Sequence, residues 1–302
     1  MRRLRFIPEG GSLVAVSQRC FQARFLLTPN RRVNKLLAGV VARAQELYGV
    51  EIIGLSALSN HLHFLLWVRD AEQLARFMNH VAGNVAREIG RLRGWTGSFW
   101  DERYAAVLVD EAEAAQIEQL RYLLAQGCKE DLVARPRDWP GLHAASQILM
   151  GRGLEGTWID RSSLRAGSAQ VTKQIQLSRL PCWRHLDQEE YRLRVRDLIR
   201  QIEDEASRRR RSAGTGVLGR RAAMRQDPFR RPRAPKRSRL PLVHAVSRVA
   251  RRRIETAFRA FVAAYRQAAE RLRRGARDAV FPAGSFPPPA PFVSMSGSAP
   301  PG

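Results

Sequence analysis

Two histidines, His61 and His63, are the residues whose type and spacing most directly suggest chemistry. They begin an apolar and aromatic run, 61–68, which follows a polar turn at Ser59-Asn60 and is typical of a buried strand. Because strand side chains alternate between faces and each residue advances about 3.3 Å, the two imidazoles share a face, with Cα atoms roughly 6.7 Å apart. Two imidazoles on one rigid strand can form half of a site for a divalent metal. Most isolated His-x-His pairs are ordinary polar-face residues, so a metal site requires a second element.

The second element is the segment 111–127, which has the apolar spacing of a helix and carries Tyr122 and Gln126. Side chains four residues apart lie on one helical face, so the phenol and the amide are neighbours. The ordinary alternative is a tyrosine that packs in the core. That alternative is weaker here because the helix already has apolar residues at Leu120, Leu123 and Leu124.

The elements that must position these residues follow from the hydrophobic pattern. We expect strand structure within 13–27, strands at 50–58, 61–68 and 104–109, and helices at 33–48, 71–92 and 111–127. The first six elements match the split βαβ, or ferredoxin-like, pattern, in which helices lie on one face of an antiparallel sheet. The predicted class is therefore α+β, with the histidine strand in the centre of the sheet.

The composition indicates a negatively charged partner. The 302 residues carry 52 Lys and Arg against 28 Asp and Glu, a formal net charge of +24, and almost all of the basic residues are Arg. Arginine can bind phosphate in a bidentate manner, so we expect contact with nucleic acid and none with a membrane. No apolar run approaches the roughly 20 residues of a spanning helix, and we expect a cytoplasmic, nucleoid-associated protein. The cysteines fit neither a disulfide framework nor a zinc ribbon, because they are scattered at Cys20, Cys128 and Cys182.

Several ordered motifs together resemble one family. The His-x-His strand is preceded by Asn60, an aromatic and basic segment reads Phe99-Trp100-x-x-Arg103-Tyr104, and Arg121-Tyr122-Leu123-Leu124 runs into Leu132-Val133-x-x-Pro136-x-Asp138-Trp139-Pro140. This set resembles the IS200/IS605-like transposases, and within them the tyrosine (HUH, Y1) group associated with repetitive extragenic palindromes (REP). The resemblance covers about residues 10–142.

The resemblance implies a reaction and a site. His61 and His63 would be ligands of Mg²⁺ or Mn²⁺, and Tyr122 would be the nucleophile that cleaves single-stranded DNA and leaves a 5′-phosphotyrosine. Gln126 matches the position of a third metal ligand, where many relatives have Asn, and either amide offers a carbonyl oxygen. The partners implied are single-stranded or hairpin DNA and, because relatives often act as dimers, a second copy of the chain.

Four further residues are candidates for DNA binding. Arg103 and Arg121 could contact phosphates near the site, although either could also be a solvated surface charge. Trp100 could stack on an unpaired base, or it could cover the core. Tyr104 lies in or beside a strand and could contact DNA or simply pack.

The chain divides by composition into five parts. We expect a transposase-like catalytic domain at 1–142, a helical extension at 143–206 and a flexible basic linker at 207–240. An amphipathic basic helix at 241–275 and a disordered Pro-rich tail at 276–302 complete the chain. The basic C-terminal half could make extra DNA contacts, or it could be a solvated extension whose arginine content reflects genome composition.

Two other functions remain open from the sequence. The first is a nucleic-acid-binding protein without catalysis, because a split βαβ sheet with aromatic residues and basic charge also describes RNA-binding modules. The second, ranked last, is a carboxylate-metal nuclease, which would need clustered acids on one face. The geometry decides between the first and a tyrosine enzyme: Tyr122 and Gln126 must face His61 and His63.

Overall fold

The computed structural model describes residues 4–151, 153–161, 169–232, 241–276 and 278–288. In these ranges a five-stranded sheet has the order β2-β3-β1-β4-β7. Its strands are β1 (Ser12–Arg19), β2 (Glu51–Leu58), β3 (His61–Val68), β4 (Ala105–Val109) and β7 (Val243–His244). Neighbouring strands are antiparallel except β4 and β7, which are parallel. The histidine strand β3 lies inside the sheet between β2 and β1, as the sequence predicts.

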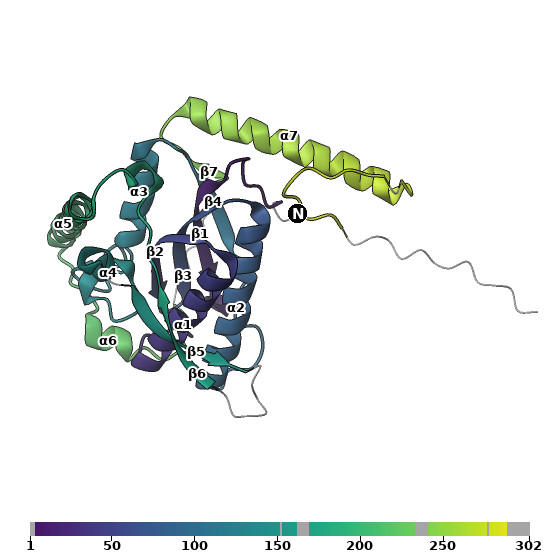
Figure 1. Cartoon of the computed structure of the whole chain (residues 1–302). Helices are drawn as coiled ribbons and strands as arrows, with labels where there is room; N and C mark the ends of the chain where they lie inside the picture. Colours follow the sequence, from purple (N-terminus) through teal and green to yellow (C-terminus); the bar gives the residue numbers. More distant parts are fainter. Residues whose placement is uncertain (1–3, 152, 162–168, 233–240, 277, 289–302) are drawn as a thin grey trace, which may run out of the picture.

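Two long helices lie on one face of the sheet (Figure 1). Helix α1 (Arg31–Tyr48) begins where the Asn30 side chain accepts from the Val33 N–H, and α2 (Ala71–Arg93) begins where Asp70 accepts from Gln73. Each ends at a glycine with a positive φ angle, where only a residue without Cβ is unstrained. Phe77 of α2 packs edge-on against Phe64 of β3, with ring centroids 6.0 Å apart. Phe64 alternates with His63, so α2 covers the face opposite the histidines.

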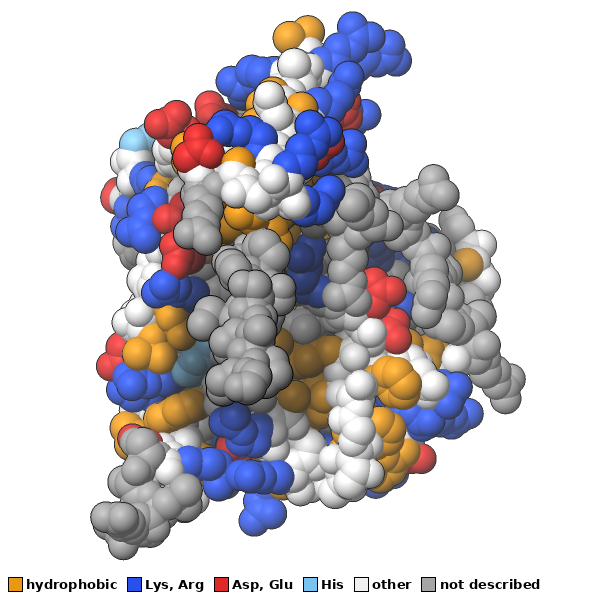
Figure 2. Space-filling view, turned by 90° about the vertical axis from the view of Figure 1, so that its right-hand side faces the viewer, with side chains coloured by type: hydrophobic (Ala, Val, Ile, Leu, Met, Phe, Trp, Pro, Cys, Tyr) orange, Lys and Arg blue, Asp and Glu red, His pale blue; other side chains and the backbone are white. Residues whose placement is uncertain are grey.

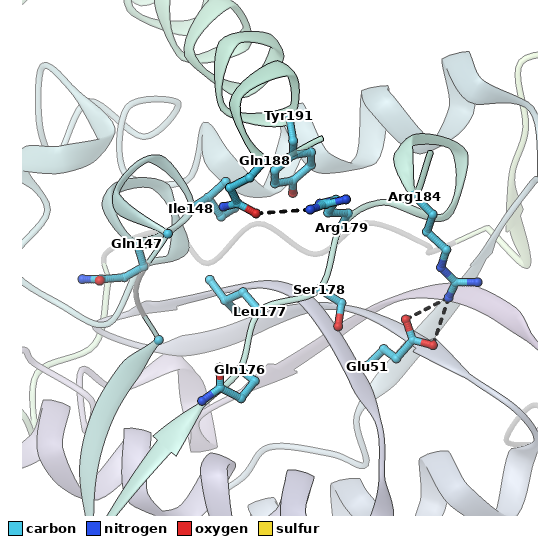
Figure 3. A pocket seen from close by; sticks show the side chains of 12 residues that line it. Glu51, Gln147, Ile148, Gln176, Leu177, Ser178, Arg179, Arg184, Gln188 and Tyr191 are labelled. Carbon is cyan, nitrogen blue, oxygen red and sulfur yellow. Dashed lines mark hydrogen bonds and ion pairs between the residues drawn. The ribbon is translucent and has the colours of Figure 1, made fainter. Parts of the chain in front are cut away.

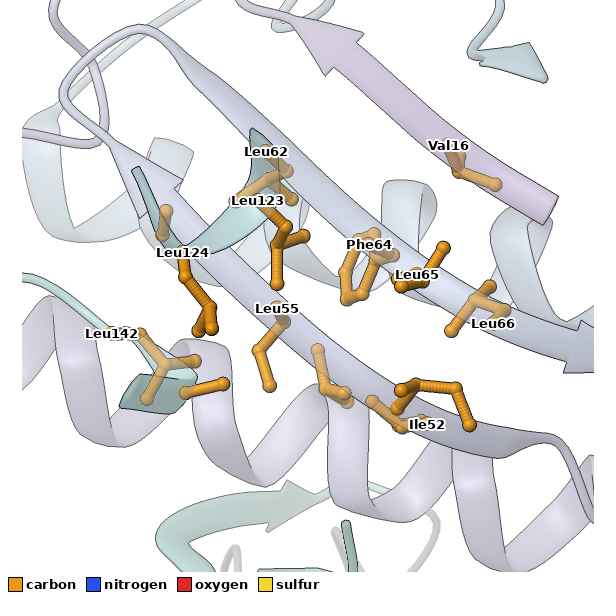
Figure 4. Packing of buried hydrophobic residues seen from close by; sticks show 14 of the residues in the cluster. Val16, Ile52, Leu55, Leu62, Phe64, Leu65, Leu66, Leu123, Leu124 and Leu142 are labelled. Atoms are coloured by element: carbon orange, nitrogen blue, oxygen red, sulfur yellow. The ribbon is translucent and has the colours of Figure 1, made fainter. Parts of the chain in front are cut away.

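Helix α3 (Glu113–Leu124) lies on the other face, the one toward which His61 and His63 point. Its Leu123 packs so closely on the sheet that a methyl group at Gly54 would lie 2.6 Å from Leu123 Cδ2. Figure 4 shows Leu123 and Leu124 packed beside β2 and β3. The predicted α+β class is confirmed, with α1 and α2 on one face as expected. The apolar side of α3 is buried on the second face, and the short strand β7 makes the sheet mixed.

The segment 143–206, expected to be a helical extension, contains strands as well as helices. It forms α4 (Ala144–Met150) and a hairpin of β5 (Leu154–Asp160) and β6 (Ala169–Ile175), whose turn at 162–168 lies outside the described residues. The hairpin packs on α1 through Gly39 of α1 and Gly156 of β5. A methyl group at Gly39 would lie 2.1 Å from the Thr157 backbone, and one at Gly156 would lie 2.0 Å from the Gly39 backbone nitrogen. Most of β6 is exposed, so it lacks the apolar alternation by which a strand is usually recognised.

The segment 207–240 was expected to be a flexible linker, but its described part contains helical structure that packs on the rest of the protein. Helix α5 (Gln188–Ala213) continues to Ala213, and α6 (Arg220–Met224) follows. The backbone N–H groups of Leu218 and Gly219 donate to the carbonyls of Asp131 and Leu132, and the Phe229 ring stacks on Trp95. A few backbone hydrogen bonds and one aromatic contact thus hold an Arg-rich segment that composition alone assigns to a linker. Residues 233–240 lie outside the described ranges.

Helix α7 (Arg248–Arg273) forms the predicted C-terminal basic helix and projects from the sheet (Figure 1). Phe6 contacts its rings Phe258 and Phe261, with centroids 5.7 and 5.2 Å away. Its range holds eight Arg and two Glu, a net charge of +6. Figure 2 shows Lys and Arg side chains gathered at the top of the molecule, where Figure 1 places α7. Most of the predicted Pro-rich tail lies outside the described residues.

The described helices include none that is both long enough and apolar enough to cross a membrane.

Candidate active site

The histidine pair lies on the face of β3 that α3 covers. His63 is paired with Ser17 on β1 and with Ser56 on β2, so strands on both sides fix its backbone. The ring centroids of His61 and His63 are 4.6 Å apart, and the rings meet edge to face. The two imidazoles therefore converge on one small volume above the sheet, as the strand spacing predicts.

The turn before β3 orients His61. The Asn60 side-chain oxygen Oδ1 lies 2.6 Å from His61 Nδ1. The same turn is held by its own backbone, because the Asn60 carbonyl accepts from Cys20 and the Ser59 carbonyl accepts from Leu27. With Nδ1 hydrogen-bonded as a donor to the amide oxygen, the lone pair of His61 is on Nε2. Asn60 thus selects the tautomer in which Nε2 can accept a proton or bind a metal.

His63 presents a buried ring nitrogen to the site. Its Nε2 is buried and forms no hydrogen bond with the described residues. Burial lowers the pKa of His61 to about 4, with smaller contributions from Arg19 and Lys129. Burial also holds the pKa of His63 well below its ordinary value, and the neighbouring His61 contributes. Both imidazoles are therefore neutral at physiological pH, which is the form that binds a metal.

Tyr122 stands beside this pair. It projects from the last turn of α3, and its ring centroid lies 6.0 Å from that of His63, edge to face. The residue is 43% exposed, so it is open to solvent on one side. The ammonium group of Lys129 lies 4.2 Å from the centroid of the same ring. The structure thus brings the predicted tyrosine, a cation and the histidine pair to one place.

Gln126 follows Tyr122 but lies beyond the helix. Helix α3 ends at Leu124, and the Gln126 side chain is turned back so that its Nε2 donates to the Tyr122 carbonyl at 3.0 Å. The residue is buried, with 1% of its surface exposed. Its amide oxygen is the only oxygen that the predicted ligand set contains. The described residues contain no cluster of three or more His, Cys, Asp or Glu side chains that could hold a metal. A metal site here would therefore consist of the two histidines and this amide.

The four residues predicted to bind DNA are not brought together. Arg121 forms an ion pair with Glu205 of α5 and lines the cavity beside Tyr122, whereas Arg103 is exposed just before β4. The Tyr104 ring is buried on the opposite face, where its hydroxyl accepts from Arg5 Nε at 3.1 Å, and burial raises its pKa. The Trp100 indole donates to the Ala82 carbonyl of α2 at 2.9 Å.

A sixth histidine, His244, joins the site from the distant strand β7. Its Nε2 lies 2.8 Å from the Glu118 carboxylate of α3, and it lines two cavities that Tyr122 also lines. These cavities measure about 500 and 220 Å³, and the smaller one also touches His63. The sequence offered no signal for this residue, because only the parallel pairing of β7 with β4 brings it near Tyr122.

Helix α5 forms a wall of the larger cavity. Arg209 of α5 donates to the Cys128 carbonyl at 2.9 Å and to the Asp131 carboxylate at 2.6 Å. These bonds fix the loop that follows α3 and carries Lys129. The C-terminal half of the chain therefore shapes the surroundings of Tyr122.

Comparisons with known proteins place the site in context. Residues 20–125, which include the histidine pair and Tyr122, match the family model described as IS200-like transposases. Two solved structures are similar to this chain, both with low sequence identity and a low TM-score. One is a REP-associated tyrosine transposase bound to a REP hairpin, with 13% identity, a TM-score of 0.40, and coverage of 50% of this chain and 86% of that chain. The other is a candidate transposase of Deinococcus radiodurans R1, with 20% identity, a TM-score of 0.29, and coverage of 40% and 95%. No curated protein matches the chain.

Proposed function

On the premise that residues 20–125 form an IS200-like transposase domain, we propose that this chain cleaves and rejoins single-stranded DNA through a covalent link to Tyr122. The observation that carries the proposal is the position of the Tyr122 ring, partly exposed and 6.0 Å from His63, whose Nε2 has no partner among the described residues. A tyrosine with a purely structural role needs neither a solvent-exposed ring nor a pair of neutral histidines beside it.

The donor set fits a divalent cation that accepts both nitrogen and oxygen ligands. His61 and His63 offer neutral nitrogens, and the buried Gln126 offers a carbonyl oxygen. We propose that these three residues hold Mg²⁺ or Mn²⁺. Such a cation, when bound, polarises the scissile phosphate and offsets the charge that develops on it. Histidine and amide ligands suit Mn²⁺ at least as well as Mg²⁺, which prefers oxygen.

The chain's own residues then perform the transfer. The Tyr122 Oη forms a bond to the phosphorus while the bond from phosphorus to the 3′-oxygen of the preceding nucleotide breaks. The phenol proton leaves through solvent, and the departing 3′-oxygen takes up a proton, which gives a 5′-phosphotyrosine and a free 3′-hydroxyl. A 3′-hydroxyl that attacks the phosphotyrosine reverses these steps and joins the strands. Because one phosphodiester replaces another, joining requires no nucleoside triphosphate.

Charge near Tyr122 would hold the DNA backbone. Lys129 lies over the Tyr122 ring, and Arg121 lines the adjoining cavity. We propose that both contact phosphates, together with Arg103 just before β4. Trp100 and Tyr104 support the fold in this proposal, because their polar atoms already bond within the protein. The histidines and Tyr122 meet within one chain, so the proposed site needs no helix from a second copy.

A cleavage assay tests the proposal. The purified chain would be incubated with single-stranded DNA that contains hairpins and with Mn²⁺ or Mg²⁺, and a protein–DNA adduct that survives denaturation would be measured. We expect an adduct in the wild type, none in Tyr122→Phe, and a loss of at least about 100-fold in His61→Ala/His63→Ala. Tyr265→Phe is the matched control, because Tyr265 lies on α7, outside the proposed site, and its hydroxyl donates a hydrogen bond to the Phe286 carbonyl.

The same assay identifies the competing function. If DNA binds with equal affinity to the wild type and to Tyr122→Phe but neither forms an adduct on the palindromic repeats of the source genome, the chain is a binding protein without catalysis. If Tyr122→Phe retains the adduct, the nucleophile is another residue.

A further inference from the structure

A third cavity, separate from the two beside Tyr122, lies at the far end of the face that carries the site. It measures about 400 Å³, within the range of small-molecule pockets. Loop residues 176–179, the start of α5 and the end of α4 enclose it, and Glu51 of β2 forms its rim (Figure 3). Most of its polar side chains are hydrogen-bond donors or amides: Gln147, Gln176, Ser178, Arg179, Arg184 and Gln188.

Tyr191 provides the first sign that the cavity binds a ligand. The residue is 4% exposed, yet its hydroxyl forms no hydrogen bond with any described group. Figure 3 shows this hydroxyl turned toward the space beside Gln188 and Arg179. A buried hydroxyl without a partner costs roughly 1–3 kcal/mol, so such groups are uncommon unless something else satisfies them.

Arg179 provides the second sign. It donates to the Leu186 carbonyl and, at 3.4 Å, to Gln188 Oε1, and it forms no ion pair within the described part of the chain. The other arginine of the cavity is already neutralised, because Arg184 binds both oxygens of Glu51 at 2.9 and 2.8 Å. Arg179 is therefore the one described cationic group in the cavity whose charge remains available for an anion.

The cavity also has apolar lining, which can contact the face of a base. Ile148 and Leu177 provide this lining (Figure 3). Glutamine amides present a donor and an acceptor side by side, which is the pattern that matches the edge of a base. A phosphate, a planar polar ring and an apolar contact occur together in a nucleotide.

The position of the cavity connects it to Tyr122. Glu51 pairs with Trp67, which lies four residues from His63 on the same face of β3, roughly 13 Å along the strand. Helix α5 runs from Tyr191 in this cavity to Ile202 in the cavity beside Tyr122, roughly 17 Å along its axis. A DNA strand of a few nucleotides can span that distance.

We propose that this cavity binds one unpaired nucleotide of the DNA strand, with a phosphate on Arg179 and the base edge on the Tyr191 hydroxyl and the Gln188 amide. The inference rests on the proposed DNA substrate and adds a second anchor to it. An unpaired nucleotide held here fixes the register of the strand relative to Tyr122. A duplex cannot use the anchor, because its bases are stacked and paired.

Tyr191→Phe tests the anchor with the least disturbance. The change removes only the unpartnered hydroxyl, so the chain should fold with the same thermal midpoint as the wild type or a slightly higher one. Fluorescence anisotropy with a labelled single strand of about 20 nucleotides of mixed sequence should report binding roughly 2- to 10-fold weaker. Binding of the same sequence as a duplex should not change. Tyr265→Phe is the matched control and should bind both probes like the wild type.

Arg179→Gln tests the phosphate contact. Single-strand affinity should fall about tenfold, and the slope of log K against log salt should decrease by roughly 0.7. Wild-type affinity and salt slope in both Tyr191→Phe and Arg179→Gln would overturn the inference. So would equal competition by inorganic phosphate and by a mononucleotide, because the cavity would then be an anion site that ignores the base.

The adduct assay on the same variants separates this inference from the proposed function. If the wild type forms the Tyr122 adduct while both variants bind single strands normally, the anchor is absent and the enzyme stands. If the wild type neither binds single strands nor forms the adduct, the proposed function fails, and the anchor fails with it.

Discussion

Gly54→Ala tests how closely the tyrosine helix is docked on the histidine face. Gly54 lies on β2 beneath α3, and the added methyl group would sit 2.6 Å from Leu123 Cδ2. Ordinary contact between two carbon atoms needs about 3.5–4.0 Å, so one side must yield by roughly 1 Å. Leu123 is almost fully buried and is adjacent to Tyr122. Its displacement therefore moves the tyrosine relative to His63.

The stability cost follows from two opposing terms. Overpacking of this kind costs about 1–3 kcal/mol, while replacement of a glycine within a strand recovers about 0.5–1 kcal/mol. We therefore expect Gly54→Ala to lower the free energy of unfolding by about 0.5–2 kcal/mol. The effect on catalysis should be larger, because a misplacement of about 1 Å in a reacting group can cost about 100-fold in rate.

A double-mutant cycle isolates the contact. Leu123→Ala alone should cost about 2–5 kcal/mol because it leaves a cavity under α3. In the double variant the methyl at position 54 fills part of that cavity, so the cost of the double variant should be smaller than the sum of the two single costs by about 1 kcal/mol or more. Urea unfolding supplies the free energies, and adduct formation at saturating DNA supplies the rates.

Strict additivity would refute the docking. It would mean that residues 54 and 123 do not touch and that α3 lies elsewhere. Normal adduct formation in a destabilised Gly54→Ala variant would show instead that Leu123 changes rotamer without moving the helix, and the link between packing and the position of Tyr122 would be wrong.

Three further predictions concern the surroundings of the site. Burial lowers the pKa of His143 from 6.5 to about 4, so its stabilising contribution is complete above about pH 6.5 and is lost as the pH falls toward 4. His143→Asn keeps an acceptor at the start of α4. Between about pH 6.5 and 4 the variant should lose less unfolding free energy than the wild type, by up to about 3 kcal/mol. His61 and His63 still make both proteins less stable as the pH falls. Trp139→Phe removes the 2.8 Å bond from its indole to the Ala57 carbonyl and should cost about 1–3 kcal/mol in chemical denaturation; a change below about 0.5 kcal/mol would contradict the burial of that bond. If α7 contacts DNA, neutralising three of its exposed arginines should reduce the salt slope of single-strand binding by about 2. The substitutions are Arg252→Gln, Arg259→Gln and Arg266→Gln. An unchanged slope would show that α7 does not contact DNA.

The sequence predicts the centre of the molecule well because strong periodicity determines it. The alternation along β3 places His61 and His63 on one face, and the helical spacing before Leu124 places Tyr122 on a helix with a buried apolar side. The same alternation, applied to β4, would have placed Tyr104 on the opposite face, where its ring is buried.

Other features depend on tertiary contacts that have no local signal. The exposed strand β6 lacks apolar alternation, and α6 is held by backbone bonds to Asp131 and Leu132. His244 reaches the site only through a short parallel pairing with β4. Gln126 lies past the end of α3, so helical spacing alone does not describe its position.

The central claim is that Tyr122 is the residue that becomes attached to DNA. The most direct measurement is mass spectrometry of the adduct after nuclease and protease digestion, which identifies the peptide that carries a nucleotide. We expect a 5′-phosphonucleotide on Tyr122 in the wild type and at least about 100-fold less modified peptide in His61→Ala/His63→Ala. A nucleotide on another tyrosine, such as Tyr104 or Tyr48, would contradict it.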